Sequence, residues 1–362
     1  MSRVASARPS RARTALAALC LLVASLSSVT PAHALERALW MRYPAISPDG
    51  RTVAFSYRGN LWKVAVTGGV ATPLTVGTWH NTMPVWSPDG SRIAFASDRN
   101  GNLDVYVVAA EGGEATRLTT HSVDEMPTSF TPDGKAVLFT AAVLDAPANV
   151  QFPGGSQPEL YRVAVTGGAP TQVLTTTAMY ARWDRAGKRL AYSDNPGFEM
   201  EWRKHDTSAF ARQLWLYDAA QGKHTRLTAF GADHRQPVWA PGDDALFYLG
   251  EDSGSFNVWR LSLADPSHPV QVTRHTGDPV RFLSVSNAGD LCYGLGGEIL
   301  VRPAGAKEST KLDVMVAADR RKRPVVPFDV TGKATEFDVS PNGREVAFVA
   351  RGEVFVASVE HG

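Results

Sequence analysis

A short turn sequence that returns at nearly regular intervals constrains this chain more than any other feature. Pro44-Ala-Ile-Ser-Pro-Asp-Gly50 recurs as Pro84-Val-Trp-Ser-Pro-Asp-Gly90. Further copies, altered to different degrees, end at Gly134, Gly187, Gly242, Gly289 and Gly343. Successive marker glycines are therefore 40, 44, 53, 55, 47 and 54 residues apart. Periods of this length are typical of repeat architectures such as β-propellers.

Each copy has the same internal order. An apolar stretch enters the turn, where proline presets φ and glycine supplies the positive φ of the exit. An alternating strand such as 52–56 follows, then a strand with an aromatic residue, a Gly-Gly or similar turn, and a strand ending in Leu-Thr or Val-Thr. Four antiparallel strands per repeat form a propeller blade. We therefore predict an all-β fold, a six-bladed β-propeller of four-stranded antiparallel blades.

The predicted organisation has four parts. Residues 1–34 form a signal peptide, 35–316 the six-bladed propeller, 317–334 a polar linker, and 335–362 the first, incomplete blade of a second propeller. In the alternative, 35–42 supplies the missing fourth strand of the last copy and closes one seven-bladed ring. The interruption of the rhythm at 317–334 favours the first arrangement.

The N-terminus has the layout of a secretory signal. A basic opening with four arginines precedes the apolar run 15–29, and Ala32-His33-Ala34 provides small residues for cleavage. The run is too short for a stable anchor. We expect cleavage after Ala34, a periplasmic or secreted chain, and no stable membrane span afterwards.

Composition and motifs argue against several function classes. Loss of the four arginines leaves 33 basic against 36 acidic residues, which does not favour a nucleic-acid partner. The sequence lacks a Gly-x-Ser-x-Gly elbow, a His-Glu-x-x-His motif and a phosphate-binding glycine loop. We therefore assign no catalytic residue, no metal site and no cofactor.

Cys292 is the one cysteine after the predicted signal, and it lies in a strand-like stretch that predicts a buried thiol.

Propeller topology places candidate ligand residues on one face. Connections after the second and fourth strands lie opposite the Pro-Asp-Gly turns, and they carry histidines and carboxylates. The candidates are His80, His121, Asp124, Glu125, His234 and His275, with Asp233 and Asp278 nearby, and Trp202 and His205 in an insertion. One hypothesis is a site for a peptide terminus or a metal ion assembled from several blades. The alternative, which the wide spacing favours, is solvated loop residues and backbone caps; for Trp202 and His205, packing is favoured over a contact surface.

The cassette resembles the TolB-like propeller repeat, which also occurs in tricorn-type proteases and in prolyl oligopeptidase-like enzymes. Three longer segments are similar to tricorn-like proteins. They are 101–119 in the second repeat, the blade-four insertion Glu201-Trp-Arg-Lys-His205 leading to 213–217, and the passage from 320–330 through 336–340 to 345–352.

This resemblance implies the N-terminal β-propeller region of an exported tricorn-like serine protease. Such proteins have two propellers, a PDZ module and a C-terminal peptidase domain, and the first propeller acts in peptide gating or docking. The implied partners are peptides or unfolded polypeptide, together with those PDZ and peptidase domains, which these 362 residues do not include. Assembly into a homo-oligomer is an open alternative. No catalytic residue of the family can be assigned here.

Two competing functions follow from the same repeat. One is a periplasmic TolB-like protein-binding propeller without enzymatic activity. The short stretch between the predicted signal and the first repeat, where such proteins carry a small α/β domain, counts against it. The other, a propeller joined to an α/β-hydrolase, would require the elbow motif.

Overall fold

The computed structural model describes residues 35–143, 157–196, 210–229, 231–317 and 329–359. The predicted signal peptide, Trp202 and His205 lie outside these ranges. Throughout the described part, the regular secondary structure consists of β-strands. No described helix is long and apolar enough to cross a membrane.

Twenty-four of the strands form six antiparallel four-stranded sheets. The first two sheets contain β2 (Arg42–Ile46), β3 (Thr52–Tyr57), β4 (Asn60–Ala65) and β6 (Thr72–Pro73), and then β7 (Asn81–Trp86), β8 (Arg92–Ser97), β9 (Asp104–Ala109) and β10 (Thr116–Arg117). The third and fourth contain β11 (Glu125–Phe130), β12 (Ala136–Ala141), β13 (Glu159–Ala164) and β14 (Thr171–Thr177), and then β15 (Met179–Trp183), β16 (Arg189–Ser193), β17 (Leu214–Asp218) and β18 (Lys223–Arg226). The fifth and sixth contain β19 (His234–Trp239), β20 (Ala245–Gly250), β21 (Asn257–Ser262) and β22 (Val270–Gln271), and then β23 (Arg281–Val285), β24 (Leu291–Leu295), β25 (Glu298–Arg302) and β26 (Thr310–Lys311).

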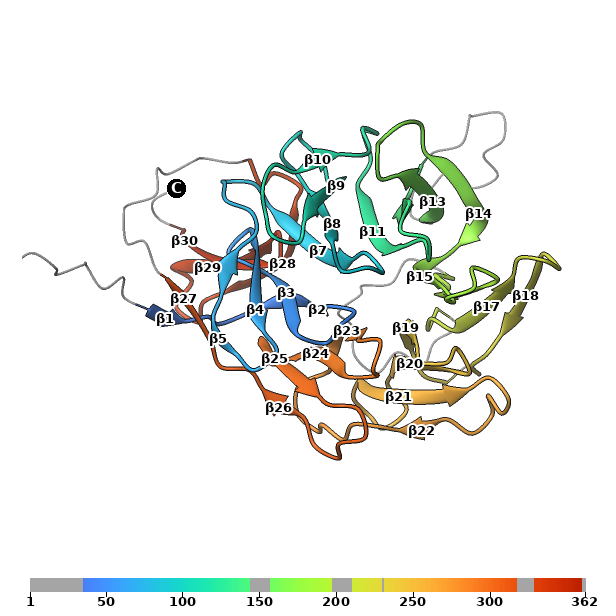
Figure 1. Ribbon diagram of the computed structural model, residues 1–362. Helices are drawn as coiled ribbons and strands as arrows, with labels where there is room; N and C mark the ends of the chain where they lie inside the picture. Colours follow the sequence, from blue (N-terminus) through green and yellow to red (C-terminus); the bar gives the residue numbers. More distant parts are fainter. Residues whose placement is uncertain (1–34, 144–156, 197–209, 230, 318–328, 360–362) are drawn as a thin grey trace, which may run out of the picture.

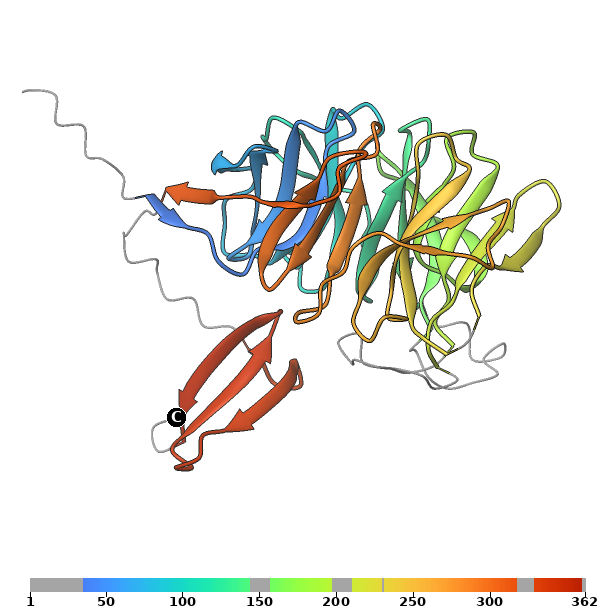
Figure 2. The same cartoon turned by 90° about the horizontal axis from the view of Figure 1, so that it is seen from below.

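The six sheets are arranged in a ring with their first strands innermost (Figure 1). The innermost strands β2, β7, β11, β15, β19 and β23 each contact the next, and β23 contacts β2. The predicted all-β propeller is therefore confirmed. Figure 2 shows the ring from the side as a thick disc.

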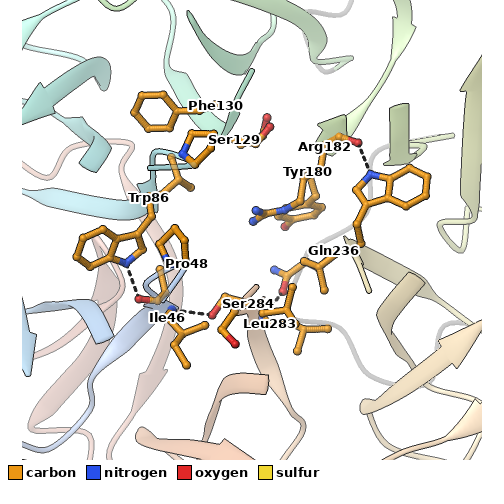
Figure 3. Close-up of a pocket in the computed structure, with 18 of the residues that line it drawn as sticks. Ile46, Pro48, Trp86, Ser129, Phe130, Tyr180, Arg182, Gln236, Leu283 and Ser284 are labelled. Carbon is orange, nitrogen blue, oxygen red and sulfur yellow. Dashed lines mark hydrogen bonds between the residues drawn. The ribbon is translucent and has the colours of Figure 1, made fainter. Parts of the chain in front are cut away.

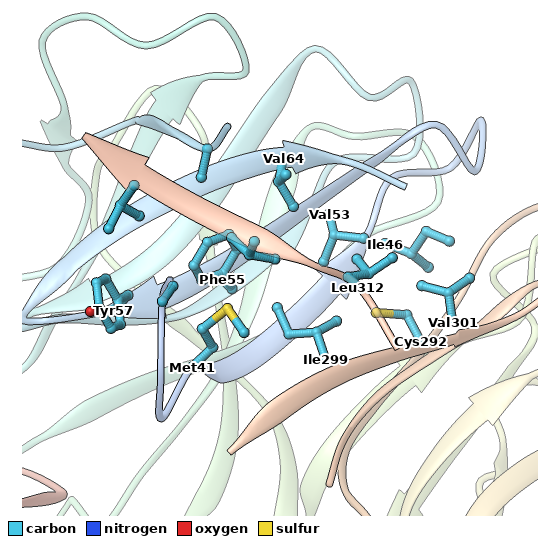
Figure 4. Close-up of a cluster of buried hydrophobic side chains, with 14 residues drawn as sticks. Met41, Ile46, Val53, Phe55, Tyr57, Val64, Cys292, Ile299, Val301 and Leu312 are labelled. Atoms are coloured by element: carbon cyan, nitrogen blue, oxygen red, sulfur yellow. The ribbon is translucent and has the colours of Figure 1, made fainter. Parts of the chain in front are cut away.

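The two ends of the ring are joined by a small additional sheet. Strand β1 (Leu35–Arg37) pairs antiparallel with β27 (Val314–Ala317), which runs parallel to β5 (Gly69–Val70). Beneath this sheet, buried side chains of the first and sixth sheets form one cluster, in which Phe55, Ile299 and Cys292 are fully buried (Figure 4). Burial also raises the pKa of the Cys292 thiol, so this group is an inert part of the core.

The repeated residues have the same hydrogen-bonding role in several sheets. Ser47 Oγ donates to Asp49 Oδ1 and accepts from the Thr52 N–H, which fixes the first Pro-Asp-Gly turn. The threonine that ends the Leu-Thr pair accepts the N–H of the third strand through its hydroxyl. This bond joins Thr75 to Leu61, Thr119 to Val105, Thr228 to Leu214 and Thr273 to Val258.

A further sheet of three strands follows the ring. It contains β28 (Ala334–Val339), β29 (Glu345–Ala350) and β30 (Glu353–Ser358), and it lies outside the disc in Figure 2. Its β29–β30 turn contacts the ring, where Arg351 pairs with Asp98 after β8. Strand β1, which the seven-bladed alternative assigned to this sheet, pairs with β27 instead, because that edge lies beside it in the closed ring. Of the predicted linker 317–334, residues 318–328 lie outside the described ranges, and the domain boundaries stay predictions.

Candidate ligand site in the central channel

A cavity of about 330 Å³ occupies the centre of the ring, at the end that carries the Pro-Asp-Gly turns (Figure 3). All six innermost strands contribute to its wall, and the turn prolines Pro48, Pro88 and Pro132 form part of its rim. Protein sites for small ligands typically have volumes of about 300–1,000 Å³. The cavity is therefore large enough for a small ligand or for part of a peptide.

A β-bulge in each innermost strand shapes this wall. The register shifts between the first two strands of every sheet, for example between Thr82 and Val85 and between Arg281 and Ser284. In five of these strands a residue other than glycine has a positive φ of 50–59°; these residues are Tyr43, Met83, Tyr180, Gln236 and Phe282. All five line the cavity. Bulges redirect side chains, and strained backbone is frequent at binding sites.

Hydrogen bonds between neighbouring sheets hold the wall together. These bonds run from Trp86 Nε1 to Ala45 O, from Ser129 Oγ to Ala181 O, from Trp239 Nε1 to Arg182 O, from Leu283 N to Gln236 Oε1, and from Ile46 N to Ser284 Oγ. The Tyr43 and Phe282 rings, from the first and sixth sheets, contact each other with centroids 4.2 Å apart. The wall therefore holds its side chains in place before any ligand binds.

Buried prolines lie in several of the innermost strands. Pro44, Pro84 and Pro127 lie in β2, β7 and β11, the edge strands that face the channel. A proline has no N–H to offer to an added strand. At these three positions the edge strand has no N–H to offer, which disfavours pairing with an added strand there.

Arg182 is the one cationic side chain directed into the interior of this cavity among the wall residues drawn in Figure 3. Arg182 is half-buried, and part of the residue remains accessible from the channel. Burial lowers the pKa of Arg182 to about 10, so the guanidinium stays charged at neutral pH. In the described ranges, no side chain forms an ion pair or hydrogen bond with this guanidinium.

The two carboxylates that line the cavity have other partners. Asp184 Oδ2 accepts from Arg189 Nε at 2.9 Å, and Asp243 Oδ2 accepts from the Arg185 N–H at 3.0 Å. Arg185 itself lies exposed at the turn end. Neither carboxylate lies within 4.0 Å of the Arg182 guanidinium, so the enclosed positive charge is not neutralised by the described wall.

The first group of predicted ligand residues lies around the end of β10 and the start of β11. His121 is exposed, and its Nδ1 accepts the Val123 N–H, while Asp124 Oδ1 accepts the Leu103 N–H. Glu125 is buried, and burial raises its pKa to about 7. These contacts fix the connection between two sheets.

The other predicted histidines are held within their own sheets or by nearby loops. His234 is buried, with Nδ1 3.2 Å from Gln213 Oε1 and Nε2 3.0 Å from Asp252 Oδ2. His275 Nε2 lies 3.0 Å from the Tyr293 hydroxyl. The His80 backbone N–H donates to Asp98 Oδ1. Burial, and then the charges of Arg351 and Arg42, lower the pKa of the His80 ring to about 4.

In the part of the chain that the structure describes, no three histidine, cysteine or carboxylate side chains gather as a metal site would require. The structure does not bring His80, His121, His234 and His275 into such a group, and their predicted ligand role stays a prediction. Sequence reasoning did not find the channel site. The available signal was the repeat itself, because Arg182 occupies a position where other copies have small residues.

Comparison with known proteins supports the fold and defines the family. Residues 38–307 match the family described as the tricorn protease N-terminal β-propeller domain. A crystal structure of the tricorn protease is similar with a TM-score of 0.65 and 20% identity, over 89% of this chain and 30% of that one. TolB from Acinetobacter baumannii has a TM-score of 0.50 and 20% identity, over 67% of this chain and 56% of that one.

A curated relative is the uncharacterized peptidase YuxL of Bacillus subtilis (strain 168), 23% identical over 327 residues. The match covers 64% of this chain, and the chain spans half the length of that relative. The structural likenesses, at 20% identity, show the fold alone. The family match extends over more than half of the sequence, and the chain belongs to the family of the tricorn protease N-terminal β-propeller domain.

Proposed function

We propose that this propeller is the non-catalytic portion of an exported tricorn-like serine peptidase and acts in peptide docking or gating for a peptidase domain. The single observation that carries the proposal is the central cavity of about 330 Å³, whose wall comes from all six innermost strands. Residues with a positive φ, at the β-bulges of the innermost strands, line that space. Prolines in three of these strands disfavour the addition of a peptide strand to the wall. A short or extended peptide segment fits these properties.

The sheet β28–β30 supports a role within a larger assembly. Phe337, Val354 and Val356 are between 66% and 79% exposed, although such side chains are usually buried in a blade. Exposed apolar surface of this kind marks an interaction site or a neighbouring unit. In the proposed peptidase, the rest of a second propeller covers these residues.

Peptide binding to the purified chain tests the proposal. Met83→Trp adds bulk to the channel wall at a position where Tyr43, Tyr180 and Phe282 show that the backbone accepts an aromatic ring. We expect this variant to fold and to bind a fluorescent hexaalanine peptide at least about tenfold more weakly than the parent chain. Val270→Trp, on the exposed outer strand β22, is the matched control and keeps the parent affinity.

Equal binding by both variants, or no peptide binding by the parent chain, would contradict channel docking. Binding of an intact folded protein without any peptide binding would instead favour the TolB-like function. Export is tested separately by N-terminal sequencing of the protein recovered outside the cytoplasm. Cleavage after Ala34 is the expected result, and an intact N-terminus would contradict it.

A further inference from the structure

Arg182 breaks the internal repeat at one point of the channel wall. Arg182 is the next-to-last residue of β15, the innermost strand of the fourth sheet. The next-to-last residues of the other five innermost strands are Ala45, Val85, Ser129, Val238 and Ser284. Each of these residues lines the cavity, so the position faces the channel or its wall throughout the ring. Five copies show that the fold itself is satisfied by a small side chain here. The arginine of the fourth sheet is therefore not explained by the needs of the blade.

The described wall gives the charge of Arg182 no partner, although part of the residue remains accessible from the channel. Removing a cation from water without giving it a partner costs free energy. Desolvation is the cause that lowers its pKa, and no described carboxylate is close enough to oppose that effect. Trp239 fixes the backbone of the same residue through a hydrogen bond to its carbonyl oxygen. The backbone of Arg182 is therefore fixed by this hydrogen bond, and its side chain extends into the cavity (Figure 3).

We propose that Arg182 is an anion site in the channel and that it binds a carboxylate of a peptide. This inference rests on the proposed peptide docking and names the group that is recognised. A guanidinium matches a carboxylate with two parallel hydrogen bonds. Because the site is enclosed, a bound carboxylate supplies the counter-charge that the described wall lacks.

The charge of the site favours a carboxylate over a phosphate group. A phosphate monoester carries a charge of about −1.5 to −2 at pH 7 and has three strong acceptor oxygens. The cavity offers one guanidinium without a described side-chain partner, and its wall also contains apolar residues such as Phe130, Trp183 and Pro84. One enclosed positive charge balances one carboxylate. The carboxylate can come from a peptide C-terminus or from an acidic side chain, and the experiment separates these sources.

The test compares three fluorescent hexaalanine-based probes by anisotropy with the purified chain. The first has a free C-terminal carboxylate, the second a C-terminal amide, and the third an amide with one internal glutamate. The parent chain is expected to bind the first or third probe at least about tenfold more tightly than the second. Arg182→Met should bind all three equally weakly, and Arg182→Lys should recover part of the preference. Arg162→Met, which changes an exposed arginine of β13, should behave as the parent.

A second measurement uses the smallest carboxylate. Acetate should shift the side-chain Nε–H resonance of Arg182 in a ¹⁵N-labelled sample, whereas acetamide should not. If the parent chain binds the free and amidated peptides equally, or if Arg182→Met keeps the preference, the carboxylate site is overturned while channel docking stands. If acetate binds at Arg182 but no peptide binds, peptide docking fails and the anion site stands. If acetate leaves the resonance unchanged, the anion site is overturned.

Discussion

Trp239 donates its indole N–H to the carbonyl oxygen of Arg182 at 2.9 Å, across the junction of the fourth and fifth sheets. Trp86 makes the corresponding bond to Ala45 at 2.8 Å across the junction of the first and second. The same structural bond therefore supports an alanine in one place and a half-buried arginine in the other. The indole hydrogen bond therefore contributes to the stability of the ring at both junctions, whereas we assign the arginine side chain at one of them to ligand binding.

Replacing Arg182 should stabilise the protein. Arg182→Met keeps much of the side-chain volume and removes a half-buried charge that has no described partner. We expect the free energy of unfolding to rise by on the order of 1 kcal/mol, measured by urea denaturation at pH 7. Val238→Met at the matching position of the fifth sheet should be neutral or destabilising. A clear loss of stability in Arg182→Met would mean that the arginine is a structural partner.

The two indole bonds should differ in their effect on binding. Trp239→Phe and Trp86→Phe each remove one hydrogen bond between sheets, and each should lower the free energy of unfolding by about 1 kcal/mol. Only Trp239→Phe should also reduce the preference for carboxylate probes, because it frees the backbone of Arg182. Thermal unfolding and probe anisotropy measure the two effects. An equal loss of preference in both variants would count against the positioning role of Trp239.

The threonine that ends each Leu-Thr pair should be important for stability. Thr228→Val leaves the buried N–H of Leu214 without its hydroxyl acceptor and should cost about 1–3 kcal/mol. Thr225→Val, on the exposed strand β18, should change the free energy of unfolding by less than about 0.5 kcal/mol. Denaturant unfolding gives both values. Equal effects would show that the repeated threonine is not needed for its hydroxyl.

Acidification should destabilise the region around His80. Its folded pKa of about 4 lies below the ordinary value of 6.5, so the unfolded chain binds more protons between these two values. The free energy of unfolding should therefore fall as pH decreases from about 6.5 to about 4, by on the order of 1–3 kcal/mol from this group. His80→Gln should remove that part of the pH dependence. Parallel curves for the two proteins would contradict the effect.

Local chemistry made much of the fold predictable from the sequence. The Ser-Pro-Asp-Gly turn at 47–50 contains its own hydrogen-bond partners, and the alternation in 52–56 indicates a strand without knowledge of its neighbours. The predicted thiol burial at Cys292 also agrees with the structure. These features depend on residues close together in the chain, so they can be read directly from it.

The candidate site depends on contacts that the sequence order does not reveal. His234 lies beside Gln213 and Asp252, two residues in other connections, and these contacts keep its ring buried. Glu125 is likewise buried at a sheet junction, although its charge suggests a solvated loop. Arg182 could be noticed by comparing the repeats, but only the closed ring shows that it lines the central cavity and has no described side-chain partner.

The most direct test of this account is a crystal structure of the chain with whichever carboxylate-bearing hexaalanine probe binds more tightly. The account predicts peptide density inside the central channel, with a carboxylate oxygen within about 3 Å of an Arg182 guanidinium nitrogen. Peptide bound along the outer strands, or a channel in which Arg182 contacts a protein carboxylate in place of the ligand, would contradict it.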